Sequence, residues 1–168
     1  MTKIVPTVEL KPMTDDEFDA YVSLLAEEYA RECLQSGRVT DPEKARELGR
    51  EAMTASLPDG LASKDHFVYT VYDAVTDERV GSLWLALRER EKLEAFIYDI
   101  RVEESLRGLG YGRATMIACI RRANELDAPS LGLHVFGHAA VPRALYASLG
   151  FIETDVIMSL PLDGMAAG

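Results

Sequence analysis

Features that would place the chain in a specialised class are largely missing. The longest apolar runs are far too short to cross a bilayer. The first residues, Met1 to Pro6, lack the apolar core of a signal peptide. Cysteine is scarce, and Cys33 and Cys119 stand far apart without a metal-binding spacing. These absences predict a cytoplasmic protein with no membrane association, no bound metal and no disulfide framework.

Positive charge is also scarce. The sequence has 18 Lys and Arg against 28 Asp and Glu, a net charge of −10. A nucleic-acid partner is therefore not expected, because such binding needs a basic surface. The acidic balance suits a cationic substrate such as an amine, and surface solvation explains it equally well. Arg107, Arg113, Arg121 and Arg122 form a basic exception around a glycine-rich stretch, where they suit a polyanionic ligand; Arg121 and Arg122 equally suit a solvated helix face.

The length of 168 residues suits one domain over residues 1–168, and no linker interrupts it. Capping-box patterns at Thr14–Glu17 and Thr40–Glu43 predict two helices, ending near Gly37 and Leu57. The periodicity predicts further helices and strands on either side. The remaining helices are expected at Arg113–Glu125 and Val141–Leu149, and the strands at Val8–Met13, His66–Asp73, Val80–Leu87, Leu93–Val102, Leu131–Phe136 and within Ile152–Leu160.

The stretch from Arg107 to Arg113 is the most informative one. It holds Gly108, Gly110 and Gly112 between an expected strand and an expected helix. Such a turn aims several backbone N–H groups and the helix dipole at one point, which suits a phosphate or pyrophosphate. The glycine spacing fits neither the dinucleotide fingerprint nor the Walker A loop. A plain strand-to-helix turn is the alternative.

Two motifs together resemble the GNAT N-acetyltransferases. The first is the R-x-x-G-x-G pattern from Arg107 to Gly112, which resembles their acyl-CoA loop. The second, from Arg143 to Phe151, resembles their A-x-x-L-Y-x-x-x-G-F segment. The two motifs and the strand between them span roughly residues 93 to 160. The resemblance implies an α/β fold (α+β in stricter usage) with a mixed central sheet flanked by helices, whose central strands splay apart to admit acetyl-CoA.

The same resemblance implies where acetyl-CoA, a cosubstrate, would bind. The backbone of Ile100, Arg101 and Val102 would pair with its pantetheine arm, and one of their N–H groups would serve as the oxyanion donor. The phosphates would lie against the loop residues Arg107, Gly108, Leu109, Gly110, Tyr111, Gly112 and Arg113. The chain departs from the family at Ala139, where an asparagine that touches the CoA arm is common.

Acetyl transfer to an amine needs a base for the amine, donors for the oxyanion and a proton for the leaving thiolate. By resemblance, Tyr146 is the candidate acid. His134 lies on the strand and at the spacing at which the ribosomal-protein alanine acetyltransferases place a glutamate base, and imidazole is a suitable base near neutral pH. Asp99 is the third candidate, to orient His134, to act through water or to hold an ammonium. Packing of Tyr146, a satisfied buried His134 and a structural salt bridge of Asp99 are the alternatives.

The chain is accordingly expected to be a single-domain N-acetyltransferase for a small cationic amine or a protein amine, attacked directly. Residues 14–57 would form one wall of the acceptor pocket, with Glu27, Glu28 and Glu32 on it. An exposed edge on the closing strands would allow a homodimer. The alternatives are a CoA-binding regulatory or partner-binding domain, a Rossmann-type nucleotide binder and an O-acetyltransferase.

Overall fold

The computed structural model describes residues 5–162, which form two compact units. The first ends at His134 and holds most of the secondary structure, and the second begins at Val135. Each unit is described separately below. The expectation of one domain over residues 1–168 stays a prediction.

A mixed sheet organises the first unit. Its strands are β1 (Val8–Pro12), β2 (His66–Asp73), β3 (Arg79–Glu89), β4 (Leu93–Val102) and β5 (Leu131–Leu133), in the order β1-β2-β3-β4-β5. The first four pair antiparallel and β5 runs parallel to β4. The predicted mixed α/β sheet is confirmed, and so are the His66–Asp73 and Leu93–Val102 strands and the antiparallel pairing around Thr76–Glu78.

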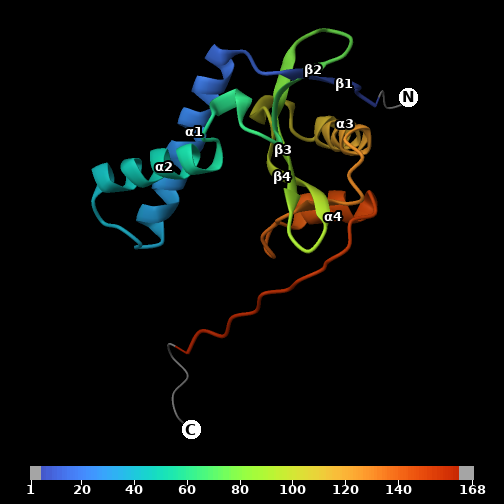
Figure 1. Ribbon diagram of the computed structural model, residues 1–168. Coiled ribbons are helices and arrows are strands. Elements are labelled where there is room, and N and C mark those ends of the chain that lie inside the picture. Colours follow the sequence, from blue (N-terminus) through green and yellow to red (C-terminus); the bar gives the residue numbers. More distant parts are fainter. Residues whose placement is uncertain (1–4, 163–168) are drawn as a thin grey trace. The chain divides into compact units, whose positions relative to one another are not determined.

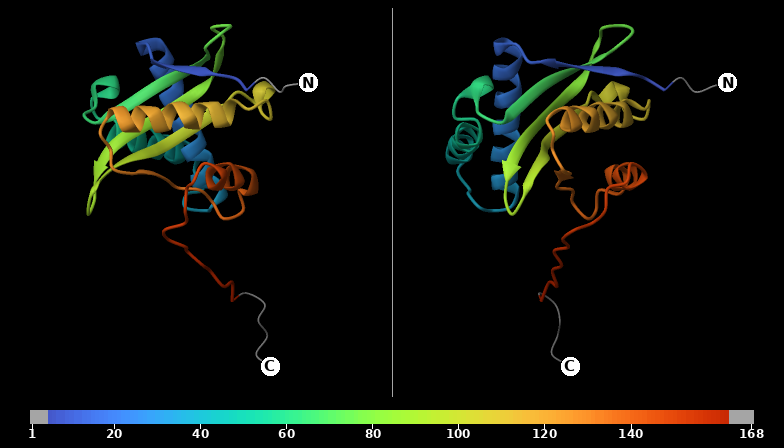
Figure 2. Two further views of the ribbon diagram at one scale, coloured as in Figure 1. Left: turned by 90° about the vertical axis from the view of Figure 1, so that its right-hand side faces the viewer. Right: turned by 45° about the vertical axis from the view of Figure 1, so that its right-hand side comes forward.

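Helices cover both faces of this sheet. They are α1 (Asp15–Gln35), α2 (Pro42–Ser56) and α3 (Tyr111–Glu125), with short 3₁₀ turns η1 (Gly60–Ala62) and η2 (Glu104–Leu106). Figure 1 shows α1 and α2 on one side of the strands and α3 on the other, and both views of Figure 2 agree. Arg121 and Arg122 lie near the C-terminal end of α3, so the basic group predicted around the glycine stretch loses two of its four members there.

The core has two layers because side chains alternate across each strand. On the α1 side, Trp84 and Val68 pack with Tyr21, Met13 and Leu57. On the α3 side lie fully buried side chains from β3 and α3, among them Leu83, Leu85, Met116 and Cys119. Both cysteines are buried and unpaired, and burial raises the pKa of the Cys119 thiol to about 12, which makes that thiol unreactive.

The helix starts follow local hydrogen bonding. The predicted capping box of α1 is confirmed: the Glu17 N–H donates to Thr14 Oγ1 at 3.3 Å, and the Thr14 N–H donates to Glu17 Oε2 at 2.8 Å. The second box is wrong. Asp41 caps α2 instead, accepting from the Glu43 N–H at 3.0 Å, because Pro42 occupies the first helical position and makes its predecessor the cap.

The second unit contains α4 (Ala140–Ser148). Its end is a Schellman motif: Gly150 has φ +96°, its N–H donates to the Ala147 carbonyl, and the Phe151 N–H donates to the Tyr146 carbonyl. The rings of Phe151 and Tyr146 pack with centroids 5.8 Å apart. The predicted glycine cap is confirmed.

The strands predicted after β4 are shorter or missing. β5 covers Leu131–Leu133 instead of Leu131–Phe136, because its pairing with β4 ends at Ile97. Residues 151–162 contain no helix or strand, and apolar side chains such as Ile157 are exposed there. Apolar residues at strand spacing supply the side chains for a sheet, but a strand also needs a paired neighbour, and the sequence pattern does not specify one.

A close approach of α1 and α2 at Gly49 yields a stability prediction. A Cβ on Gly49 of α2 would lie 2.2 Å from the Ala26 carbonyl oxygen of α1. Gly49→Ala gains about 1 kcal/mol of helix propensity. It forces backbone apart, however, which typically costs about 1–3 kcal/mol and can cost more. We expect a net loss in the free energy of unfolding measured by urea denaturation. Gly137→Ala is the control, because nothing lies within 4 Å of its Cβ position; equal stability of both variants would contradict the prediction.

Candidate functional site

A β-bulge in β4 shapes the centre of the candidate site. Trp84 of β3 lies opposite Asp99, whereas the next residue, Leu85, lies opposite Ile97, so Tyr98 is an extra residue on β4. A bulge bends its strand and redirects the side chains around it. Here both Tyr98 and Asp99 line a cleft on the α1 side of the sheet.

The bulge also changes which backbone groups of β4 face outward. Before it, the Ala95 N–H donates to the Ser130 carbonyl beside β5. After it, the Glu103 N–H donates to the Val80 carbonyl near the start of β3. Because bonding direction alternates along a strand, the N–H and C=O groups of Ile100 and Val102 point away from β3. Pairing with β5 stops at Ile97, so β5 does not use these groups.

The three residues predicted to hold the pantetheine arm therefore differ in the direction in which their backbone N–H and C=O groups point. Ile100 and Val102 present their backbone groups on the side away from β3, whereas the alternation directs those of Arg101 toward it. Arg107 Nε lies 3.4 Å from the Val102 carbonyl oxygen, so the predicted loop arginine contacts this same edge.

The glycine stretch forms the start of α3. Gly108 and Gly110 have φ of +76° and +99°, a conformation that favours glycine, and Gly110 is the N-cap without a capping side chain. The first intrahelical bond runs from the Ala114 N–H to the Gly110 carbonyl. The N–H groups of Tyr111 and Gly112 therefore precede the hydrogen-bond ladder of the helix, and the helix dipole adds partial positive charge there.

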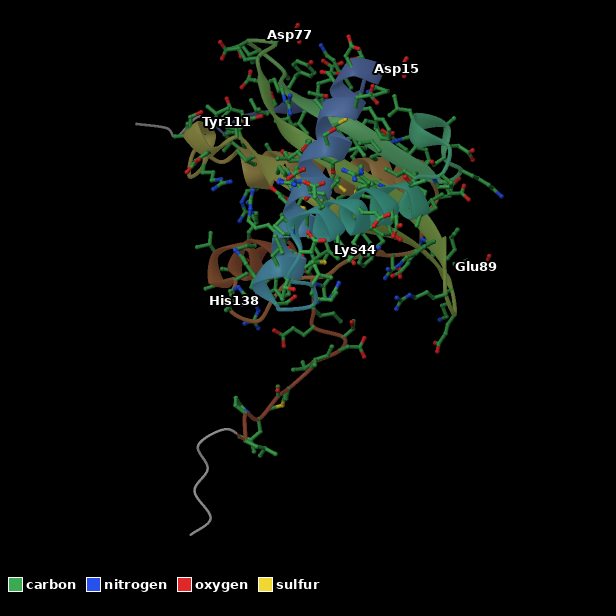
Figure 3. The ribbon with its side chains drawn as sticks, turned by 90° about the vertical axis from the view of Figure 1, so that its left-hand side faces the viewer. Asp15, Lys44, Asp77, Glu89, Tyr111 and His138 are labelled. Carbon is green, nitrogen blue, oxygen red and sulfur yellow. The ribbon has the colours of Figure 1, made fainter. Side chains whose placement is uncertain are left out.

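Tyr111 anchors this helix start to the sheet. Its hydroxyl donates to Asp73 Oδ2 at 2.7 Å, which lowers the pKa of the Asp73 carboxyl and raises that of the Tyr111 phenol. Figure 3 labels Tyr111 at the start of α3, and also Asp77 in the β2–β3 turn that follows Asp73. The side chain of Tyr111, one of the predicted loop residues, thus stabilises the fold, whereas its backbone N–H lies at the N-terminus of α3.

A cleft of about 310 Å³ lies between the helix pair and strands β3 and β4. Figure 3 shows α1 and α2 in front of the sheet, with Asp15 at the start of α1 and Lys44 on α2. The cleft is lined by Leu25, Glu28, Tyr29, Glu32, Met53, Ser56, Trp84, Tyr98, Asp99 and Arg101. Of the acidic residues predicted for this wall, Glu28 and Glu32 line the cleft and Glu27 does not.

An ion-pair network joins the two walls of the cleft. Arg101 donates to both oxygens of Asp99, through Nε at 2.8 Å and Nη2 at 3.1 Å. It donates to both oxygens of Glu28 at 2.7 and 2.6 Å, which lowers the pKa of the Glu28 carboxyl. Buried Tyr21 donates to Asp99 Oδ2 at 2.8 Å. The structural salt bridge considered for Asp99 is therefore present.

Aromatic rings form another part of the cleft, which the sequence reasoning did not identify. Tyr98 stacks on Trp84 with centroids 4.9 Å apart and an interplanar angle of 21°. Trp84 Nε1 donates to His66 Nδ1 at 2.9 Å, and burial lowers the pKa of His66. His66 thus supports Trp84 from outside the cleft lining. The sequence signal that could have indicated this part of the cleft is the pair of Tyr98 and Asp99 within a largely apolar strand.

The remaining candidates lie near and beyond the boundary between the units. His134 follows β5 directly and is exposed, so the alternative of a buried histidine does not apply. Tyr146 lies on α4, where burial raises the pKa of its phenol. His138 stacks on Phe136 with centroids 5.5 Å apart. Arg143 donates to the Gly137 carbonyl at 2.9 Å and pairs with Glu153.

Over residues 5–162, the acidic, cysteine and histidine side chains form no group that could hold a metal ion. In the same part of the chain, none of the helices has the length and apolar character to span a membrane.

Known proteins resemble this chain over nearly its whole length. Residues 25–151 match the Acetyltransferase (GNAT) family. Two Bacillus subtilis proteins named as uncharacterized N-acetyltransferases are similar: YycN, 38% identical over 93% of this chain and 99% of YycN, and YdgE, 33% identical over 89% of this chain and 94% of YdgE. The crystal structure of YycN superposes with a TM-score of 0.79 at 37% identity, covering 93% of this chain and 99% of that one. With the family matched over most of its length, the chain belongs to the GNAT acetyltransferases.

Proposed function

We propose that the protein is a cytoplasmic N-acetyltransferase that transfers an acetyl group from acetyl-CoA to a primary amine by direct attack. The observation that carries this proposal is the outward-facing backbone of Ile100 and Val102, which leads along β4 to the glycine-rich start of α3. A strand edge suits an extended amide-bearing arm, and a helix N-terminus suits its phosphates.

The loop residues have different roles in binding acetyl-CoA. The N–H groups from Gly108 to Arg113 face the diphosphate, since backbone donors at a helix start suit an anion. Arg107, which touches the Val102 carbonyl, orders the loop against the strand. The backbone groups of Ile100 and Val102 bind the pantetheine amides, and one of their N–H groups donates to the oxyanion.

The chemistry forms an N–C bond and breaks the C–S bond of the thioester. An alkyl ammonium has a pKa of about 10.4, so forming the neutral amine at pH 7 costs roughly 4–5 kcal/mol. His134 accepts this proton, and Tyr146 donates a proton to the leaving sulfur. Three hydrogen bonds occupy most of the acceptor capacity of Asp99. We assign the acceptor site that remains on the Asp99 carboxylate to hold the ammonium before proton transfer.

One observation favours the second candidate function, a CoA-binding regulatory domain with weak catalysis. Ala139, at the position of the family's asparagine, is the N-cap residue of α4, and its side chain makes no capping hydrogen bond. Both the cap and the amide contact to the CoA arm would be lost at this position.

The catalytic roles are tested by acetyl-CoA-dependent thiol release with an accepted amine. Tyr146→Phe keeps the ring that packs on Phe151, so we expect an intact fold and a loss in kcat of about 10²-fold, typical of a general acid. His134→Ala should lower kcat similarly. Tyr72→Phe is the matched control, because it removes the same hydroxyl from a tyrosine of β2 whose hydroxyl donates to Glu17 of α1. If Tyr146→Phe matched that control, Tyr146 would be a packing residue only.

Substitutions at Ala139 can separate the two effects expected of the family's asparagine, which are capping of α4 and an amide contact to the CoA arm. Ala139→Asn and Ala139→Ser both supply a cap and should each stabilise α4 by about 1 kcal/mol in thermal unfolding. Only asparagine offers an additional amide, so only that variant should bind acetyl-CoA more tightly, by about fivefold in calorimetry. Equal affinity of the two variants would show that the amide contact is absent.

The structural role of Tyr111 predicts a separation between stability and binding. Tyr111→Phe removes the hydrogen bond to Asp73, and the unfolding midpoint should fall while KM for acetyl-CoA stays within about twofold. The lowered pKa of Asp73 stabilises the fold above the ordinary carboxyl pKa and is lost as the pH falls through the folded value. The variant should therefore lose less stability than the parent on acidification. A large rise in KM would instead give the phenol a role in binding.

A further inference from the structure

The charge and shape of the cleft beside Asp99 indicate which amines the protein accepts, an inference that rests on the proposed acetyltransferase function. The cleft volume of about 310 Å³ lies at the lower end of the roughly 300–1,000 Å³ usual for small-molecule sites. It therefore suits a slender acceptor. Helices α1 and α2 form one wall, and β3 with the bulged part of β4 forms the other.

Negative charge dominates the lining. Glu28, Glu32 and Asp99 bring three carboxylates, against the single guanidinium of Arg101. That guanidinium is engaged by Asp99 and Glu28 through four hydrogen bonds. It is consequently not offered to an anionic substrate, and a carboxylate entering the cleft meets a net negative environment.

Glu32 is the carboxylate of the cleft lining that takes no part in the ion-pair network of Asp99, Arg101 and Glu28. Its side chain forms no ion pair among residues 5–162. Glu28 and Glu32 stand four residues apart on α1. They therefore lie on one helix face, about 6 Å apart along the axis. Because Arg101 joins Glu28 to Asp99, Glu32 lies about one helix turn beyond this carboxylate network, a length that a propylene or butylene chain can span.

The aromatic wall suits the rest of such a molecule. The stacked rings of Trp84 and Tyr98 and the ring of Tyr29 border the cleft. Ring faces attract cations and also cover alkyl chains. Arg38, which is outside the lining, donates to the Tyr29 hydroxyl at 3.0 Å and so helps to hold this ring in the C-terminal half of α1.

We propose that the cleft selects alkyl diamines and polyamines: primary amines with a second positive charge one short alkyl chain away and no carboxylate nearby. Glu32 is the specificity-determining residue, because it binds the distal ammonium while the near one lies toward Asp99 and the backbone of β4. Amino acids with a free carboxylate are excluded by the same negative charge.

Binding can be measured without catalysis, because Trp84 is the single tryptophan of the chain and lines the cleft. Titration of the intact protein with 1,4-diaminobutane, 1-aminobutane and lysine should change the Trp84 fluorescence. We expect diaminobutane to bind at least about fivefold more tightly than aminobutane. Lysine should bind more weakly than lysine amide, which lacks the carboxylate.

Variants then assign the selectivity to one side chain. Glu32→Gln should lower kcat/KM for diaminobutane about fivefold more than kcat/KM for aminobutane, and it should leave KM for acetyl-CoA unchanged. Glu27→Gln is the matched control: it removes the same charge from the same helix at a residue outside the cleft lining. This control variant should change kcat/KM for neither amine.

The outcomes separate this inference from the proposed function. Equal affinity and equal turnover of diaminobutane and aminobutane would overturn the diamine proposal and leave the acetyltransferase intact. A fluorescence preference for diaminobutane without turnover of any amine would support the cleft's selectivity and contradict the enzymatic reading. Preferred acetylation of peptides over free diamines, or an equal effect of Glu27→Gln, would also overturn the inference.

Discussion

The extra residue in β4 is the constraint on which the candidate site depends. Without Tyr98 as a bulge, strand alternation would place Tyr98 and Asp99 on opposite faces, and one of them would leave the cleft. The same insertion changes the parity of the ladder, so that Ile100 and Val102 turn their backbone groups away from β3. One local irregularity thus sets both the acceptor side and the acyl side of the proposed reaction.

Arg101 holds the geometry that the bulge creates. It connects Asp99 on β4 with Glu28 on α1, while Tyr21 fixes the other side of Asp99. Charges withdrawn from water carry a desolvation cost, which these paired hydrogen bonds offset. Such a network is weak evidence for stability, but it fixes α1 against the strand and so fixes the width of the cleft. It also leaves Glu32 as surplus negative charge.

The sequence predicted best what depends on near neighbours. The capping box at Thr14, the glycine start of α3 and the Gly150 cap are set within a few residues, and all three are present. The cleft depends on contacts such as Tyr21 with Asp99, 78 residues apart, which no periodicity encodes. The bulge escaped prediction because Tyr98 fits an unbroken strand pattern. The closing strands failed because apolar spacing at Ile152–Leu160 does not provide a partner strand.

The two family motifs are, physically, two helix ends. Gly110 begins α3 and leaves N–H groups for an anion, whereas Gly150 ends α4 in a Schellman motif that packs Phe151 on Tyr146. Helix termination therefore explains the leucine-tyrosine-glycine-phenylalanine pattern, in which Phe151 packs on the ring of Tyr146. The fold uses the ring of Tyr146, whereas the proposed mechanism uses its oxygen, so the two roles are compatible. The proposed selection of the acceptor needs neither helix end, since it rests on carboxylates along α1 and on the bulged part of β4, which line the same cleft.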